Sequence, residues 1–171
     1  MHFPIAVRYC LIVLTTVALA SCGFHLRSDK TLPSDINYLH LESSTRNAPL
    51  IRALTVRMGV YQIDGGTEAN PAYQDSTITL RLQPEKLDRR LLSVFSTGQV
   101  AEYELIYGVR YTVTLPDGTQ IENFFEVLRE YQDDPDQVLA KSRELNLVLS
   151  EMRVEAADRI IRLLSSQYSQ G

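Results

Sequence analysis

The alternation of apolar and polar residues between positions 101 and 115 is the strongest structural signal in the sequence. Every odd position in this stretch is apolar, whereas the even positions are mostly polar or small. A period of two over this length predicts a long strand with one buried and one solvent-facing side. The positions expected to be buried are Ala101, Tyr103, Leu105, Tyr107, Val109, Tyr111, Val113 and Leu115.

Directly after this strand, Pro116-Asp117-Gly118 predicts a chain reversal. Proline suits the second position of a type I turn, and glycine suits the left-handed residue that follows. A two-residue loop would place Val113 opposite Glu122, whereas a three-residue loop keeps apolar residues opposite one another, so the apolar pattern favours the longer loop. The predicted pairs are Val113 with Ile121, Val109 with Phe125, and Tyr107 with Val127.

Two segments carry apolar residues at helical spacing. The first is predicted over 49–58, with Asn47 as its N-cap and Gly59 as its C-terminal stop. The second opens with Asp134, Pro135 and Gln137, residues typical of a capped helix start. Its apolar face, which ends near Leu164, comprises Leu145, Leu149, Met152, Ala156, Ile160 and Leu163.

Two further strands complete the predicted fold. Residues 36–41 alternate weakly, and Ile78, Leu80 and Leu82 alternate clearly before a bulge or break near Pro84. The order strand, helix, three strands, helix predicts an α+β two-layer sandwich, in which a four-stranded mixed sheet carries two helices on one face. The other face would be available to a partner and would carry Glu102, Glu104 and Arg110.

Residues 1–21 are predicted to be a targeting segment. Arg8 precedes an uncharged apolar run, Leu11 to Ala20, that is too short to span a bilayer. The run ends in Leu19-Ala20-Ser21-Cys22, which resembles the lipobox of bacterial lipoproteins. That resemblance implies cleavage before Cys22 and its modification with diacylglycerol and an N-acyl chain such as palmitate. The alternative is an ordinary secretory signal followed by a chance cysteine.

The remaining chain, 22–171, is expected to form one domain, with residues 22–35 as a tether and 165–171 as a frayed tail. Gly23 stands where an aspartate commonly retains lipoproteins at the inner membrane, so we expect an outer-membrane anchor. The formal net charge of −4 argues against general nucleic-acid binding.

Catalytic and metal-binding motifs are not evident in the sequence. It contains neither Gly-x-Ser-x-Gly nor His-Glu-x-x-His, and only His25 and His40 would remain after cleavage. Asp133, Asp134 and Asp136 lack the ordered frame and distal glutamate of a calcium loop. We therefore predict a protein that is not an enzyme and that uses no cofactor besides the covalent lipid on Cys22.

Basic residues gather at Arg81, Lys86, Arg89 and Arg90, and Lys141 and Arg143 add charge near the start of the last helix. One interpretation is that they are ordinary solvated surface residues, or basic residues that protect exposed strands from pairing with other chains. The other is a site for an anionic amphiphile, because arginine pairs with phosphate through two oriented donors.

The mature sequence resembles the LptE family of lipopolysaccharide-assembly lipoproteins. The resemblance rests on Cys22-Gly23-Phe24-His25-Leu26-Arg27, Leu32-Pro33, Ser93-Val94-Phe95, Gly98-Gln99, Ala101-Glu102-Tyr103, Leu139-Ala140-Lys141, Glu144 and Glu151-Met152. It implies a lipid-anchored protein that plugs the LptD β-barrel of the outer membrane from its periplasmic side, assists assembly of that barrel, and binds lipopolysaccharide for delivery to the outer leaflet.

The resemblance also implies lipopolysaccharide-binding residues. Lys141 matches a basic position associated with that contact, but Ser96 stands where some relatives carry a basic residue. Arg89 or Arg90 would have to replace it. The alternative function is a generic outer-membrane lipoprotein that binds soluble lipid or another envelope protein.

Overall fold

The strand predicted by the alternation is the centre of a six-stranded sheet. A computed structural model describes residues 32, 35–45, 48–132 and 138–167. Its strands are β1 (Tyr38–Ser43), β2 (Gly65–Gly66), β3 (Thr77–Leu82), β4 (Lys86–Val94), β5 (Val100–Thr114) and β6 (Gln120–Gln132). Its helices are α2 (Pro49–Val60), the 3-10 helix η1 (Pro71–Ser76) and α3 (Val138–Gln167).

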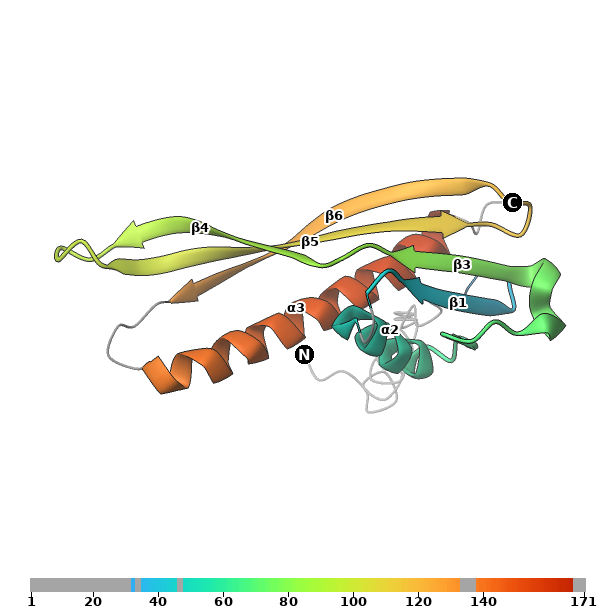
Figure 1. The fold of residues 1–171 in the computed structure, drawn as a ribbon, viewed down its shortest axis with the longest axis horizontal. Coiled ribbons are helices and arrows are strands. Elements are labelled where there is room, and N and C mark those ends of the chain that lie inside the picture. The colour runs from blue at the N-terminus through green and yellow to red at the C-terminus, as the bar shows by residue number, and fades with distance from the viewer. Residues whose placement is uncertain (1–31, 33–34, 46–47, 133–137, 168–171) are drawn as a thin grey trace, which may run out of the picture.

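On one edge β5 pairs with the whole of β6, from Glu102 to Thr114. On its other edge β3 and β4 follow one another, both antiparallel to β5. β1 lies parallel to β3, as a crossover through α2 requires, and the short β2 lies parallel to β1 (Figure 1). The sheet is therefore mixed, as predicted.

The predicted count of four strands is wrong, because the segment around Pro84 interrupts the ladder. Leu82 pairs with Tyr111 and Lys86 pairs with Gly108, so β3–β4 contains one residue more than the β5 segment opposite. This extra residue is a bulge beside a proline that lacks a backbone donor. It separates β3 from β4, and Gly65–Gly66 adds the sixth strand.

The hairpin register is confirmed. Val113 lies opposite Ile121, Val109 opposite Phe125, and Tyr107 opposite Val127. In the connecting loop the Leu115 amide donates to the Thr119 carbonyl at 2.9 Å. Gly118 has φ +84°, the left-handed conformation that the predicted bulge needs.

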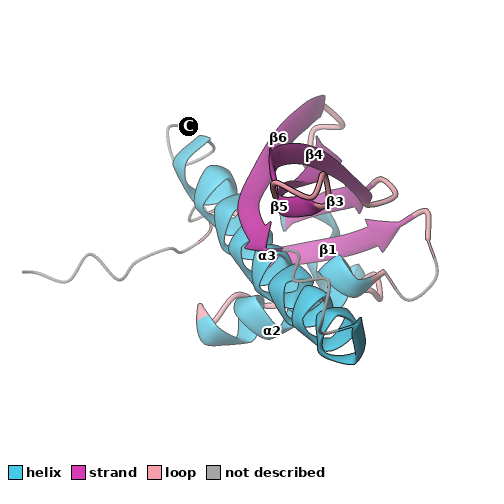
Figure 2. Ribbon diagram, turned by 90° about the vertical axis from the view of Figure 1, so that its left-hand side faces the viewer, coloured by secondary structure: helices cyan, strands magenta, loops and turns pink. Residues whose placement is uncertain are grey.

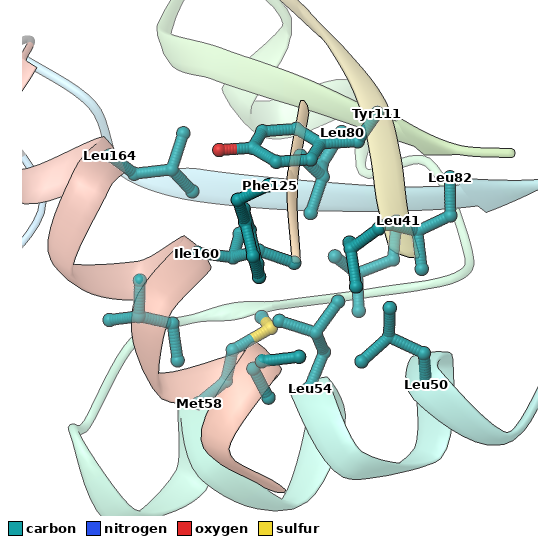
Figure 3. Close-up of a cluster of buried hydrophobic side chains, with 14 of the residues drawn as sticks. Leu41, Leu50, Leu54, Met58, Leu80, Leu82, Tyr111, Phe125, Ile160 and Leu164 are labelled. Carbon is teal, nitrogen blue, oxygen red and sulfur yellow. The ribbon is translucent and has the colours of Figure 1, made fainter. Parts of the chain in front are cut away.

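Both helices cover one face of the sheet, so the two-layer arrangement is confirmed (Figure 2). α2 buries Leu50, Leu54 and Met58. These side chains point toward Leu41, Leu80 and Leu82 of the sheet and lie near Ile160 of α3 (Figure 3). On β5 the odd positions from 105 to 113 are at most 3 % exposed, and they form the sheet side of this core: Leu105, Tyr107, Val109, Tyr111 and Val113.

The helix ends differ from the prediction. α2 continues past Gly59 to Val60, and the left-handed residue after it is Gln62, with φ +56°. Ala48 occupies the N-cap position without a side-chain cap, and Asn47 lies outside the described residues. Asp134, Pro135 and Gln137 also lie outside them.

Two boundaries of the predicted domain need correction. α3 extends to Gln167, and the Ser165 hydroxyl donates to the Ile161 carbonyl at 2.9 Å, so the frayed tail does not begin at residue 165. In the predicted tether, the apolar side chain of Leu32 is partly buried and packs against the core. The residues of 22–31 lie outside the described part of the chain.

Candidate functional site

The β4–β5 hairpin, residues 86–108, projects past α2 and past the first turn of α3 along the long axis of the molecule (Figure 1). We call this hairpin the arm. Its turn is closed by hydrogen bonds from the Phe95 amide to the Gln99 carbonyl at 2.8 Å and from the Gly98 amide to the Phe95 carbonyl at 2.9 Å. Gly98 adopts φ +83°, a left-handed conformation that favours glycine at this turn.

The end of the arm exposes a run of apolar side chains. Their exposed fractions are 53 % for Leu91, 44 % for Leu92, 53 % for Val94 and 45 % for Phe95. Single exposed apolar residues are ordinary, but a contiguous group is typical of an interaction surface. We call residues 91–95 the arm tip.

The arm tip was not among the predicted site residues, although the sequence contains a signal for it. Alternation fails at Leu91-Leu92-Ser93-Val94-Phe95, where four of the five residues are apolar. The pairing with β5 is irregular at the same place, between Leu91 and Ser93 and again between Ser93 and Val94. A bulge of this kind turns consecutive apolar side chains toward solvent instead of alternate ones.

The predicted basic cluster is largely neutralised by neighbouring carboxylates. Arg81 donates to Glu42 with a distance of 2.8 Å between Nε and Oε2. Lys86 lies 2.8 Å from Asp88, whose carboxylate raises the pKa of the Lys86 ammonium. Arg90 pairs with Glu104 on β5.

Arg89 and Arg90 lie on opposite faces of the arm. Arg89 pairs in register with Leu105, a residue of the helix-covered face, whereas Arg90 pairs with Glu104 on the helix-free face. Both are exposed. Within the described chain Arg89 makes no ion pair, so it is the more available of the two cations.

The structure places only the backbone of Lys141, in the first turn of α3. That turn lies at the same end of the molecule as the arm (Figure 1). The other predicted site residue, Cys22, is outside the described residues. The lipidation of Cys22 and a joint site of Lys141 with Arg89 and Arg90 therefore stay predictions.

The helix-free face of the sheet is partly apolar. Phe124 is 56 % exposed and Leu128 is 49 % exposed, and the Arg110 guanidinium lies 5.2 Å from the centre of the Phe124 ring. The two carboxylates predicted to lie on this face are engaged: Glu104 with Arg90, and Glu102 as acceptor from Ser93 at 2.7 Å. Glu122, Glu126 and Glu130 of β6 are exposed on the same face, so acidic residues surround the two apolar side chains.

Among the described residues, no group of histidine, cysteine and carboxylate side chains could hold a metal ion. Nor does any helix in the described ranges have the length and apolarity needed to cross a membrane.

Comparison with known proteins gives consistent matches. The model of the family described as "LptE: Lipopolysaccharide-assembly" matches residues 37–164. The LPS-assembly lipoprotein LptE of Photorhabdus laumondii is 31 % identical over 154 residues, which cover 90 % of this chain and 82 % of that protein. The protein of the same name from Pectobacterium atrosepticum is 30 % identical over 88 % of this chain and 80 % of its own.

Solved structures agree with these matches. The crystal structure of rare lipoprotein B from Shewanella oneidensis has a TM-score of 0.66 at 40 % identity, covering 77 % of this chain and 96 % of that one. The solution structure of an uncharacterized lipoprotein B from Nitrosomonas europaea has a TM-score of 0.67 at 21 % identity, covering 87 % and 94 %, and it supports the fold alone. Because the family model and relatives at 30 % identity or more span most of the sequence, the chain belongs to the LptE family of lipopolysaccharide-assembly lipoproteins.

Proposed function

We propose that this chain is the lipid-anchored subunit of the lipopolysaccharide translocon, which plugs the LptD barrel from the periplasmic side of the outer membrane and binds lipopolysaccharide. Membership of the LptE family supports the general role. The arm tip is the observation that carries the proposal, because it is an exposed apolar surface on a hairpin that reaches beyond the helices.

The composition and exposure of the arm tip are more typical of a surface that binds a protein partner than of one that stays in water. Its residues are close to half exposed although they are among the most apolar types. The helix-free face adds Phe124 and Leu128 as a second exposed apolar group. A barrel wall that contacted both would bury an area well above the roughly 1,600 Å² of a standard interface.

For lipopolysaccharide binding we propose Lys141 and Arg89 as the phosphate-contacting cations, with Arg90 in a secondary role. Arg90 already pairs with Glu104, so a phosphate would have to compete with a carboxylate for it. Arg89 has no such competitor among the described residues. Each exposed pair contributes only about 0.2–1 kcal/mol, so burial of acyl chains would have to supply most of the affinity.

The lipid site is tested by lipopolysaccharide binding to the full chain purified in detergent. Lys141→Asp and Arg89→Asp should each weaken binding several-fold, and the double variant should weaken it further, with a strong dependence on salt. Arg162→Asp is the matched control, because Arg162 is an exposed arginine near the other end of α3. Equal binding by all four variants would show that Lys141 and Arg89 are ordinary surface residues.

We also propose that Cys22 is the mature N-terminus and carries the lipid anchor. One acyl chain gives only marginal membrane binding, whereas several chains give firm anchoring. Intact-mass measurement of the membrane-extracted protein should give the mass of residues 22–171 plus a diacylglycerol and an N-linked acyl chain. An unmodified Cys22 would contradict this proposal.

A further inference from the structure

The helix-free face contains a pocket that neither the arm tip nor the proposed lipid site uses. Its volume is about 360 Å³, within the roughly 300–1,000 Å³ range of small-molecule pockets. Its lining comes from η1 and the β5–β6 loop, and both segments lie at the end of the molecule opposite the arm (Figure 1).

The floor of the pocket is a row of three polar residues that crosses the sheet. His40 of β1 pairs in register with Thr79 of β3, which pairs with Thr114 of β5. All three lie on the helix-free side, because their neighbours Leu39, Ile78 and Val113 belong to the core. Ala69, Asn70, Pro71, Gln74, Thr77, Leu115 and Pro116 form the walls.

The wall formed by residues 69–77 is held in place by its own contacts. Tyr73 stacks on Tyr38 with ring centres 5.9 Å apart, and the Tyr38 hydroxyl donates to the Glu68 carbonyl at 2.9 Å. The Thr77 hydroxyl donates to the Tyr73 carbonyl at 2.6 Å. These contacts fix the loop over the sheet, so the pocket is formed without a ligand.

Several polar groups of the pocket are without partners in the described chain. The hydroxyls of Thr79 and Thr114 and the amide of Gln74 make no hydrogen bond to another described residue. The Nδ1 atom of His40 is shielded from solvent and has no hydrogen-bond partner in the described chain, while its Nε2 lies 3.4 Å from Glu42. Because a ligand in the pocket cannot reach this shielded nitrogen, the hydroxyls of Thr79 and Thr114 and the amide of Gln74 are the polar groups open to a ligand.

The chemistry of the lining selects the class of ligand. The lining residues include no lysine, arginine, aspartate or glutamate, which disfavours an ionic ligand. Its hydroxyl, amide and imidazole groups both donate and accept, as sugar hydroxyls do. Pro71, Leu115 and Pro116 offer apolar surface to the carbon face of a sugar ring.

A peptide strand fits less well. Strand addition needs a free sheet edge, but here β1 is flanked by β2 and β3, and β5 by β3 and β6. From the neutral lining, the unpartnered threonine hydroxyls and Gln74 amide, and the apolar walls, we propose that this pocket binds a neutral sugar unit of an envelope glycan. The proposal depends neither on the barrel nor on the acyl chains of a lipid.

The test is a titration followed by NMR on the full chain, purified in a detergent that has no sugar headgroup. Glucose, galactose and N-acetylglucosamine are added first. Core oligosaccharide from delipidated lipopolysaccharide and glycan fragments from peptidoglycan follow in separate arms, which identify the source of the sugar. We expect saturable shifts of the His40 imidazole and Thr79 methyl signals with at least one titrant.

Thr114→Val and Thr112→Val form a matched pair, because both remove one hydroxyl from the same face of β5 and only Thr114 lines the pocket. Thr114→Val should weaken binding about three- to tenfold, the cost of one hydrogen bond, and Thr112→Val should leave it unchanged. Ala69→Trp, at an exposed wall position, should abolish binding by filling the pocket.

Absence of a saturable shift with every titrant would overturn the proposal, and so would equal binding by the two threonine variants. Barrel binding by Thr114→Val should be unchanged, so a failure of the sugar site is distinguishable from a failure of the proposed translocon role.

Discussion

Glu85, in the bulge between β3 and β4, connects the sheet to both helices. Its Oε1 accepts the Leu50 amide at 3.0 Å, in the first turn of α2. Its Oε2 accepts two hydrogen bonds from the Arg153 guanidinium of α3, at 2.9 and 3.1 Å. The two charged side chains are only 21 % and 23 % exposed. Hydrogen bonds to charged groups in such surroundings are among the stronger polar contributions to stability.

Glu85→Ala should lower the free energy of unfolding by about 2–4 kcal/mol, because it leaves Arg153 half-buried without its carboxylate and an α2 amide without its acceptor. Denaturant unfolding measures the change. Glu122→Ala, at an exposed glutamate of β6, is the control and should stay within about 0.5 kcal/mol of the parent protein. A similarly small effect of both variants would show that the contacts of Glu85 with Leu50 and Arg153 contribute little to the stability of the fold.

Tyr107 gives a prediction at alkaline pH. It is 1 % exposed, and its hydroxyl interacts with the Glu85–Arg153 pair. Burial, and secondarily the Glu85 carboxylate, raises the pKa of Tyr107 above its ordinary value of 10.0. Because the folded-state pKa is higher than the unfolded one, this tyrosine destabilises the fold only as the pH rises above about 10.

Tyr107→Phe should therefore be close to neutral or slightly stabilising near pH 7, and its advantage over the parent protein should grow above about pH 10. Unfolding free energies measured at several pH values for both proteins test this. A constant difference across that range would mean that the hydroxyl ionises equally easily in the folded and unfolded chains.

At the scale of elements, two glycines should respond in opposite ways to the same substitution. Gly118 has φ +84° in the β5–β6 loop, so a side chain strains the turn. Gly59 lies inside α2, and a Cβ added there meets no atom within 4 Å.

Gly118→Ala should destabilise the protein by about 1 kcal/mol, whereas Gly59→Ala should stabilise it by roughly 0.4–1 kcal/mol through lower entropy of the unfolded chain. Thermal unfolding of the two variants measures both signs. A stabilising Gly118→Ala would contradict the turn geometry on which the hairpin register rests.

The hairpin register could be predicted because two independent signals agree. The alternation defines which side chains share a face, and Pro116-Asp117-Gly118 sets the loop length, so only one pairing satisfies both. The bulge near Pro84 was predictable for the same reason, since the apolar residues change from even to odd positions across it. The number of strands could not be predicted in this way. The sequence pattern indicates a bulge, but it does not show whether the bulge divides one strand into two.

The candidate site was less predictable than the fold. Arg89 and Arg90 are adjacent in sequence, yet their side chains diverge because neighbouring residues of a strand face opposite sides. The pairing of Arg90 with Glu104 depends on the β4–β5 register, which no turn motif defined. Likewise His40, Thr79 and Thr114 are far apart in sequence, and only the order of β1, β3 and β5 brings them together.

At the scale of the whole molecule, the two-layer body leaves its arm and one sheet face uncovered. The outer edge of β6 is partly covered by α3, since Arg159 donates to the Glu126 carbonyl at 3.2 Å and its guanidinium lies 4.5 Å from the centre of the Phe125 ring. The arm tip has no comparable cover in the described chain, and Leu91, Leu92, Val94 and Phe95 stay exposed. A partner that contacted the arm tip together with Phe124 and Leu128 would cover both exposed apolar groups and leave the pocket at the other end of the sheet open.

The arm tip therefore offers a test that separates binding from folding. The double variant Leu92→Ser/Val94→Ser should weaken association with the barrel at least tenfold, while its unfolding free energy stays within about 1 kcal/mol of the parent, because both side chains are about half exposed. Val56→Ser/Val60→Ser on the exposed side of α2 is the control, since these residues are 67 % and 59 % exposed. Equal association by the two double variants would exclude the arm tip from the interface.

The most direct measurement for the proposed plug is affinity purification of the full chain from native outer membranes, with quantification of what accompanies it. A plug with a large interface should recover the LptD barrel in one-to-one ratio and retain it through detergent and moderate salt. Recovery of the lipoprotein alone, or with substoichiometric barrel that salt removes, would contradict the account.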